Sequence, residues 1–153
     1  MQETKLSYEA VNAADLDQAI ENGHAEDLLP RHPLPDQLVG DHIRLQQILI
    51  NLVKNALKFC RRGTVRVVAA YDSDAEMLKV HVVDTGRGIL EEDIERLFTK
   101  FCKLSRTVEL NSEGIGLGLI ICQNLVHESG GTISVHSPGA DQGCTISFTM
   151  KMQ

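Results

Sequence analysis

The longest regular pattern in the chain is a run of apolar residues at helical spacing over residues 42–60. Apolar residues fill most of its circumference, which predicts that most of this circumference is buried. Asp41 stands directly before the run as a helix cap, and Arg61-Arg62-Gly63 ends it. This stretch therefore predicts the principal helix of the fold.

A narrow polar stripe runs along this helix, with its members four, four and three positions apart. Asparagine is unfavourable inside helices, so two asparagines and a lysine on so apolar a helix need an explanation. The stripe either faces water or lines a cleft for a polar ligand, and the spacing favours neither interpretation. Its members are Gln47, Asn51, Asn55 and Lys58.

The sequence predicts two pairs of adjacent strands, of which the first is rich in valine, and a further strand at an edge of the sheet. The first pair is joined by the polar turn Asp72-Ser73-Asp74. The predicted strands are residues 5–11, 64–71, 77–83, 132–136 and 144–150.

Three shorter segments, 16–21, 91–98 and 117–128, carry helix signals, and the last ends at Gly130-Gly131. Helices and strand pairs are interleaved rather than strictly alternating, which argues against a doubly wound parallel sheet. The predicted fold class is α+β, a two-layer α/β sandwich. It has a mixed, mostly antiparallel sheet with helices on one face.

The composition is that of one globular domain. The chain has 153 residues, of which 42% are apolar and 24% charged, enough for a core without disulfides or a metal. We therefore expect residues 1–153 to form a single domain. No stretch approaches the roughly 20 apolar residues that span a bilayer, and there is no signal-peptide pattern. A cytoplasmic domain is expected, whether or not a longer parent protein is membrane-bound.

Net charge and cysteine spacing narrow the possible partners and metals. The formal charge of −6 repels polyanions, so nucleic acid is not expected as a partner. The four cysteines form no Cys-x-x-Cys pair, which predicts free thiols in a reducing compartment and disfavours a zinc site. They are Cys60, Cys102, Cys122 and Cys144.

Two glycine-rich segments are further candidates for chemistry. Asp84-Thr85-Gly86-Arg87-Gly88 follows a predicted strand, where Asp84 can accept a hydrogen bond from an amino group and Arg87 is expected in solvent. Gly114-Ile115-Gly116-Leu117-Gly118 opens a predicted helix, whose free amides suit a phosphate. Leu119 breaks the dinucleotide-binding fingerprint, and no P-loop sequence occurs. Any nucleotide site must therefore be of a third kind.

Four segments in this order resemble the N, G1, F and G2 boxes of sensor histidine kinases. They are residues 51–59, 84–89, 98–101 and 114–119. Weaker similarity extends toward both ends of the chain. The resemblance implies the ATP-binding (Bergerat) fold that histidine kinases share with Hsp90, gyrase and MutL proteins, and it implies ATP and Mg²⁺ as cofactors.

The resemblance also implies roles for single residues. Asn55 would hold Mg²⁺ through its amide oxygen, an oxygen ligand that suits a hard cation. Asn51 would support the polyphosphate and the metal, and Lys58 would reach a phosphate. Phe59 would lie against the nucleotide, and Asp84 would accept a proton from the adenine amino group.

The glycine boxes and a lid complete the implied site. Gly86 and Gly88 would let the base approach the main chain. Residues 102–113 would form a mobile lid, with Lys103 and Arg106 as candidates for phosphate contact. The last box would offer backbone amides to the phosphates, through Gly114, Gly116, Leu117 and Gly118.

Related ATPases, the main alternative class, place a glutamate where this chain has Asn51, four residues before the metal-binding asparagine. A carboxylate there activates water, whereas an amide cannot take a proton at neutral pH. A serine kinase of the anti-sigma type is a further alternative, disfavoured by the 98–101 segment and the closing strand pair. The resemblance thus implies a histidine protein kinase in two-component signalling.

The implied partners lie outside these residues. A helical dimerisation domain of the same kinase would carry the acceptor histidine, and a response regulator would follow downstream. The sequence contains no such acceptor hairpin, so the chain resembles the catalytic half of an enzyme. The isolated domain is expected to be a monomer.

Overall fold

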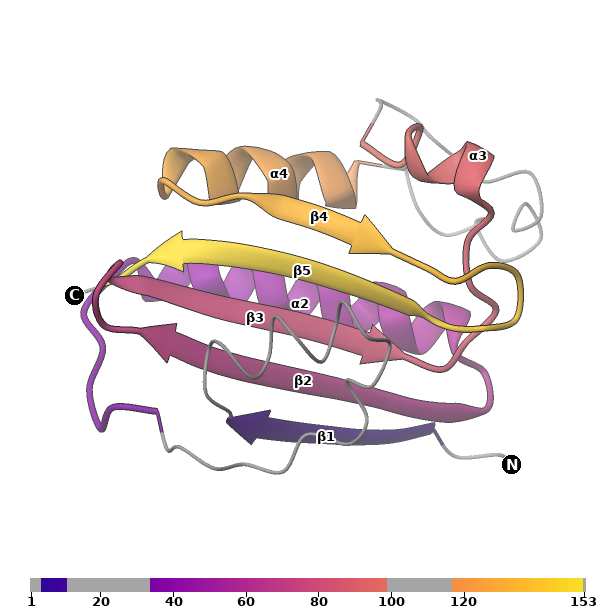
Figure 1. Ribbon diagram of the computed structural model, residues 1–153, viewed down its shortest axis with the longest axis horizontal. Helices are drawn as coiled ribbons and strands as arrows, with labels where there is room; N and C mark the ends of the chain where they lie inside the picture. Colours follow the sequence, from indigo (N-terminus) through magenta and orange to yellow (C-terminus); the bar gives the residue numbers. More distant parts are fainter. Residues whose placement is uncertain (1–3, 11–33, 99–116, 153) are drawn as a thin grey trace.

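The computed structural model describes residues 4–10, 34–98 and 117–152 (Figure 1). Within them, five strands form one sheet in the order β1-β2-β3-β5-β4. β1 pairs with β2 in parallel, and the other neighbours pair antiparallel. The predicted mixed, mostly antiparallel sheet is confirmed, with an edge strand from the start of the chain. The strands are β1 (Thr4–Ala10), β2 (Gly63–Asp72), β3 (Met77–Asp84), β4 (Ile133–His136) and β5 (Cys144–Lys151).

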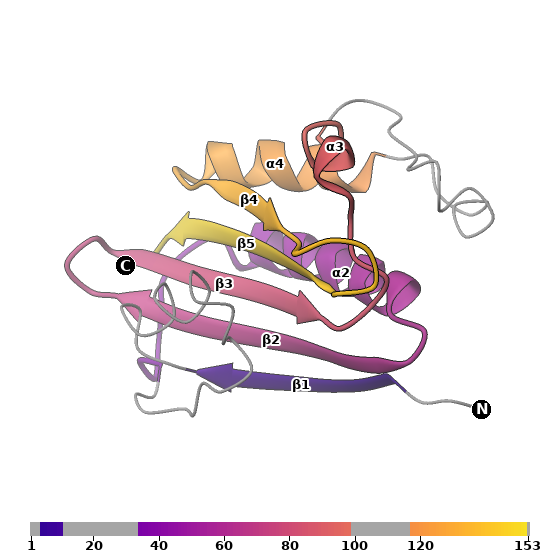
Figure 2. The same cartoon turned by 45° about the vertical axis from the view of Figure 1, so that its right-hand side comes forward.

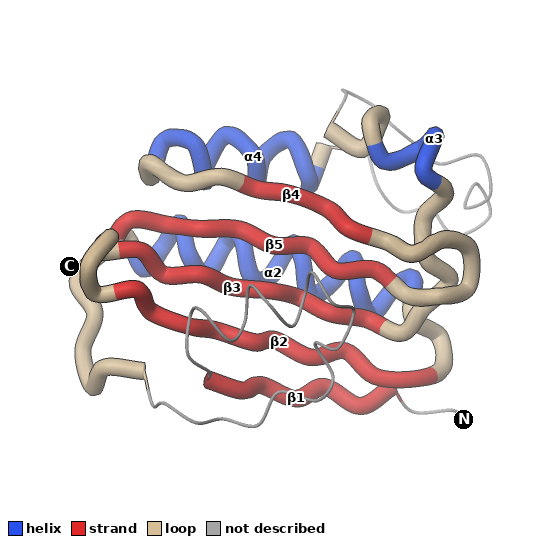
Figure 3. The backbone as a smooth tube through the Cα atoms, viewed as in Figure 1, coloured by secondary structure: helices blue, strands red, loops and turns tan. Residues whose placement is uncertain are grey.

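Two helices, α2 (His42–Phe59) and α4 (Gly118–Glu128), pack beside each other on one face of this sheet (Figures 2 and 3). The Asp41 side chain caps α2 as predicted, because its carboxylate accepts the Arg44 backbone N–H at 3.0 Å. The two-layer α/β sandwich is therefore confirmed. None of the helices in the described ranges has the length and apolarity needed to cross a membrane.

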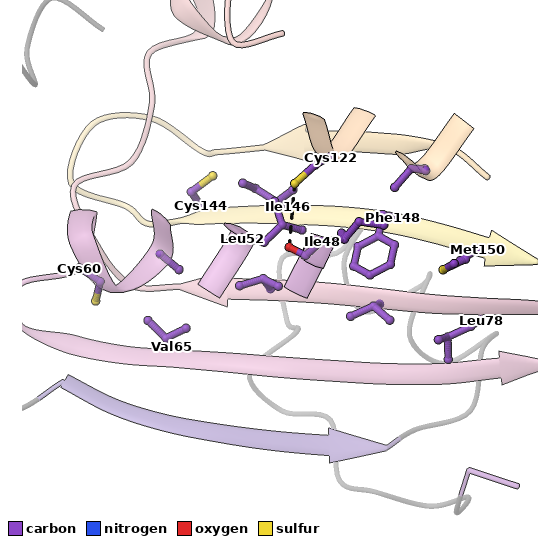
Figure 4. Close-up of a cluster of buried hydrophobic side chains, with 14 of the residues drawn as sticks. Ile48, Leu52, Cys60, Val65, Leu78, Cys122, Cys144, Ile146, Phe148 and Met150 are labelled. Atoms are coloured by element: carbon purple, nitrogen blue, oxygen red, sulfur yellow. Dashed lines mark hydrogen bonds between the residues drawn. The ribbon is translucent and has the colours of Figure 1, made fainter. Parts of the chain in front are cut away.

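The core lies between the sheet and these helices (Figure 4). Alternate residues of β3 point into it, and they pair with alternate residues of β5. Asp84 continues the inward series of β3 and pairs with Cys144. The last inward position of a buried strand is thus a carboxylate. The inward series are Leu78, Val80 and Val82 on β3, and Ile146, Phe148 and Met150 on β5.

One helix is shorter than predicted, and one lies outside the described residues. The predicted helix 91–98 is regular only over α3 (Glu91–Ile94), and turns follow it. The backbone N–H groups of Arg96 and Leu97 bond three residues back, to Asp93 and Ile94, so the chain tightens into turns. Leu97 lies in these turns and is buried, at 8% exposure. The predicted helix 16–21 lies outside the described residues.

Candidate functional site

A pocket lies where the end of β3 and the start of β5 meet the last turns of α2. It has an empty volume of about 510 Å³, part of which is open to solvent, and its wall is mostly apolar. Concave apolar sites with a few polar groups are typical of small-molecule binding. Its lining residues are Asn55, Phe59, Asp84, Arg87, Gly88, Ile89, Leu97, Leu119, Cys144 and Ile146.

Asp84 is the only carboxylate among the described residues that line this pocket, and it is 9% exposed. Burial raises its pKa to about 6, although hydrogen bonds from two backbone N–H groups oppose the rise. The N–H of Gly86 donates to Oδ1 at 2.8 Å, and the second donor is the N–H of Cys144. The pocket wall therefore holds a fixed hydrogen-bond acceptor in an apolar setting.

The turn after β3 is packed so closely that two of its residues must be glycine. A Cβ on Gly86 would lie 2.7 Å from the Phe59 carbonyl oxygen. Gly88 has φ +62°, and a Cβ there would collide with the backbone carbonyl of Gly139. The Gly143 N–H also bonds to the Gly86 oxygen at 3.0 Å. These contacts fix the turn beside Asp84, and Gly88 forms part of the wall.

The spacing of the polar stripe of α2 left open whether it faces water or lines a cleft. In the structure, different residues of the stripe do each. Asn55 lines the pocket, whereas Gln47 is exposed. The Asn51 side chain hydrogen-bonds the Cys122 thiol of α4, whose pKa burial raises to about 11. Lys58 is half-buried, with its Nζ 5.6 Å from the ring centroid of Phe59, which lines the pocket. The structure thus brings Asn55, Phe59 and Asp84 together at one pocket.

The last glycine box is described only at its end. Leu117 caps α4 without a side-chain hydrogen bond, so the first amides of the helix gain no side-chain partner from it. A Cβ on Gly118 would meet no atom within 4 Å among the described residues. As far as the described residues go, the space beside Gly118 at the start of α4 is therefore open. The predicted Lys103, Arg106, Gly114 and Gly116 lie outside the described residues.

Several lining residues were not predicted from the sequence. Arg87, expected in solvent, is half-buried and lines the pocket. Cys144 and Ile146 reach the site because β5 pairs with β3, a long-range contact without a local signal. Their alternation along a predicted strand was the available sign of an inward face. The remaining apolar members of the wall are Ile89, Leu97 and Leu119.

Known proteins resemble both this sequence and this fold. The chain is 40% identical over 122 residues to the signal transduction histidine-protein kinase BarA of Escherichia coli K12, covering 78% of this chain. It is 39% identical over 120 residues to the sensor histidine kinase GacS of Pseudomonas protegens, covering 76% of this chain. The chain spans 13% of the length of each relative.

Solved structures also have a fold similar to that of this chain. Full-length ShkA in complex with AMPPNP superimposes with a TM-score of 0.71 and 26% identity, covering 97% of this chain and 26% of that one. The catalytic domain of histidine kinase ThkA gives a TM-score of 0.66 at 25% identity, covering 96% and 79%. Residues 40–153 match the family described as histidine kinase-, DNA gyrase B- and HSP90-like ATPases. The resemblance drawn from the four sequence boxes is thereby confirmed, and the chain belongs to this family.

Proposed function

We propose that this chain is the catalytic domain of a sensor histidine kinase. It binds Mg-ATP and donates the γ-phosphate to a histidine on a separate helical dimerisation domain, from which a response regulator takes it. The observation that carries this proposal is the buried carboxylate of Asp84 in the wall of an apolar pocket. Two full-length relatives are named as histidine kinases, and one similar structure contains AMPPNP.

The pocket favours adenine over guanine. Adenine presents an amino group at its six position, whereas guanine presents a carbonyl oxygen there. A carboxylate accepts a hydrogen bond from the first and repels the second. The apolar side chains of Ile89, Leu97 and Ile146 can cover the faces of a planar base. Asp84 would therefore select the base, and the apolar wall would supply contact area.

Asn55 is the candidate magnesium ligand, because its amide oxygen suits a hard cation and it lies in the same pocket as Asp84. Bound Mg²⁺ would neutralise phosphate charge. Lys58 and the first amides of α4 near Gly118 are candidates for phosphate contact. Asn51 stands one turn before Asn55, where its bond to Cys122 orients its amide. We assign it a supporting role toward the phosphates.

Transfer to an acceptor is favoured over hydrolysis, because no group at the Asn51 position can take a proton from water. Among the described lining residues, Asp84 is the only carboxylate, and its role is at the base. Phosphoryl transfer requires mainly positioning and charge stabilisation. This domain contributes positioning and charge stabilisation, and the acceptor histidine supplies the nucleophile.

Calorimetric titration with Mg-ATP and Mg-GTP tests the assignment of Asp84. In Asp84→Asn, part of the acceptor is replaced by a donor, which costs about 1–3 kcal/mol, or about tenfold to a hundredfold in ATP affinity. The preference for ATP over GTP should fall with it. Asp141→Asn is the matched control, because Asp141 is exposed and its φ of 60° suits asparagine. Unchanged ATP binding by a folded Asp84→Asn protein would show that Asp84 does not contact the base.

A further inference from the structure

The connection from β4 to β5, residues 137–143, lies against the turn after β3 that borders the pocket (Figures 1 and 2). Its backbone donates hydrogen bonds to that turn. The Asp141 N–H bonds to the Arg87 oxygen at 2.6 Å, and the Gly143 N–H bonds to the Gly86 oxygen at 3.0 Å. The position of the turn therefore depends on this connection.

Ser137 supplies a side chain that joins the two segments. Its hydroxyl oxygen accepts the Ile89 backbone N–H at 2.9 Å and the Gly139 N–H at 3.4 Å. The hydroxyl donates to the Gly143 oxygen at 2.7 Å, which is closer than the Gly139 oxygen at 3.3 Å. A serine hydroxyl has one donor and two acceptor sites, so these three bonds use its full capacity. One side chain thus ties the turn after β3 to both ends of the connection.

The segments that Ser137 joins carry two parts of the pocket that we assign to the base. Ile89 forms part of the apolar wall. Gly143 precedes Cys144, whose backbone N–H bonds to the Asp84 carboxylate. A Cβ on Gly143 would collide with the Asp84 backbone oxygen, so this end of the connection is closely packed on β3. The Ser137 hydroxyl therefore fixes Ile89 relative to the acceptor at Asp84.

We propose that Ser137 is a positioning residue for adenine recognition. Its hydroxyl holds the turn after β3 so that Ile89 covers a face of the base while Asp84 accepts a hydrogen bond from the amino group. A site whose groups are fixed before the ligand arrives loses less affinity to ordering them. Without the hydroxyl, the Ile89 N–H and the Gly143 oxygen each lose a partner, and the turn can move relative to the carboxylate. This inference rests on the proposed binding of ATP at this pocket.

A serine that only stabilised the fold would have a different signature. Losing its hydroxyl would lower the free energy of unfolding and leave the ATP affinity of the folded protein unchanged. Ser147 provides the matched control, because it is also half-buried and its hydroxyl lies 2.6 Å from Nδ1 of His81. It alternates with the inward residues Ile146 and Phe148, so it lies on the face of the sheet away from the pocket. Ser147→Ala thus removes a comparable hydrogen bond far from the base.

Calorimetric titration with Mg-ATP and Mg-GTP, at a temperature where each variant is folded, tests this role. Ser137→Ala should weaken ATP binding about tenfold, the effect of losing a partly buried hydrogen bond, and leave GTP binding close to that of the wild type. Ser137→Thr keeps the hydroxyl and should restore the affinity for ATP. In an Asp84→Asn background, Ser137→Ala should cause little further loss, because Ser137 acts through the position of that carboxylate. Ser147→Ala should retain the ATP affinity of the wild type.

The outcomes separate this role from the function it rests on. Wild-type ATP affinity in a folded Ser137→Ala protein overturns the positioning role and leaves nucleotide binding standing. Equal losses of ATP affinity in Ser137→Ala and Ser147→Ala also overturn it, because the effect would then be a general loss of structure. If Ser137→Ala does not fold, amide hydrogen exchange of the wild type decides, since fast exchange of the Ile89 N–H without nucleotide overturns the role. A wild-type domain that does not bind Mg-ATP overturns the proposed function and this inference together.

Discussion

Burying Asp84 in the wall of the pocket should lower the stability of the ligand-free domain at neutral pH. Its carboxyl has a pKa of 3.8 in an unfolded chain and about 6 in the fold, because the pocket desolvates the charged form. Between these values the folded protein binds a proton that the unfolded chain has released. The stabilising effect of protonated Asp84 is therefore complete below pH 4 and is lost as the pH rises through 6.

The magnitude follows from the separation of the two pKa values. At about 1.4 kcal/mol for each tenfold change in proton affinity, the loss approaches about 3 kcal/mol at pH 8. Asparagine at position 84 carries no charge to desolvate, and its carbonyl can still accept the N–H of Gly86. Asp84→Asn should thus gain stability relative to wild type as the pH rises, while it loses affinity for ATP.

Urea unfolding of both proteins at several pH values between 4 and 8 measures this effect. Groups other than Asp84 titrate in both proteins, so the difference between their free energies of unfolding isolates its contribution. We expect that difference to shift by about 2–3 kcal/mol in favour of Asp84→Asn, with a midpoint near pH 5, halfway between the pKa values of 3.8 and about 6. A pH-independent difference, or a shift in favour of the wild type, would refute the reasoning about this carboxyl.

Three further predictions concern the same pocket. ATP affinity of the wild type should decline as the pH falls below about 6, because protonated Asp84 is a weaker acceptor, and calorimetry of Asp84→Asn should show no such decline. Gly88→Ala should destabilise the domain by about 1–3 kcal/mol in urea unfolding, because Gly88 has a φ of +62° and a Cβ there would collide with the Gly139 carbonyl. An unfolding midpoint equal to that of the wild type would contradict this packing. Gly118→Ala should retain wild-type stability, because no described atom lies near its Cβ, yet bind Mg-ATP more weakly. Wild-type ATP affinity in this variant would argue against phosphate contact at the start of α4.

The elements with local signals were predicted well from the sequence. The 42–60 pattern became α2 (His42–Phe59), and the valine-rich pair became β2 and β3 with bounds changed by one residue. Helical and strand periodicity are properties of neighbouring residues, so they can be read without knowing the fold. The capping carboxylate of Asp41 was predictable for the same reason.

The parts that depend on distant contacts could not be predicted. Nothing local shows that β5 inserts between β3 and β4, and this pairing is what sets Cys144 opposite Asp84. The spacing of Asn51 and Asn55 places both on one side of α2, but it does not show that a thiol of α4 binds the first. Leu97 lines the pocket from a segment that forms turns, although its sequence pattern is helical.

The central claim is that this domain positions Mg-ATP for transfer to a histidine rather than for hydrolysis. The most direct measurement follows label from [γ-³²P]ATP with and without the dimerisation hairpin, while phosphate release is recorded in the same samples. We predict slow release near background and no labelling of the domain alone, followed by acid-labile labelling of the hairpin histidine once it is added. That labelling should be weak, because the effective concentration of a linked domain is lost. Brisk phosphate release by the isolated domain, with no labelled histidine, would contradict the claim and favour an ATPase.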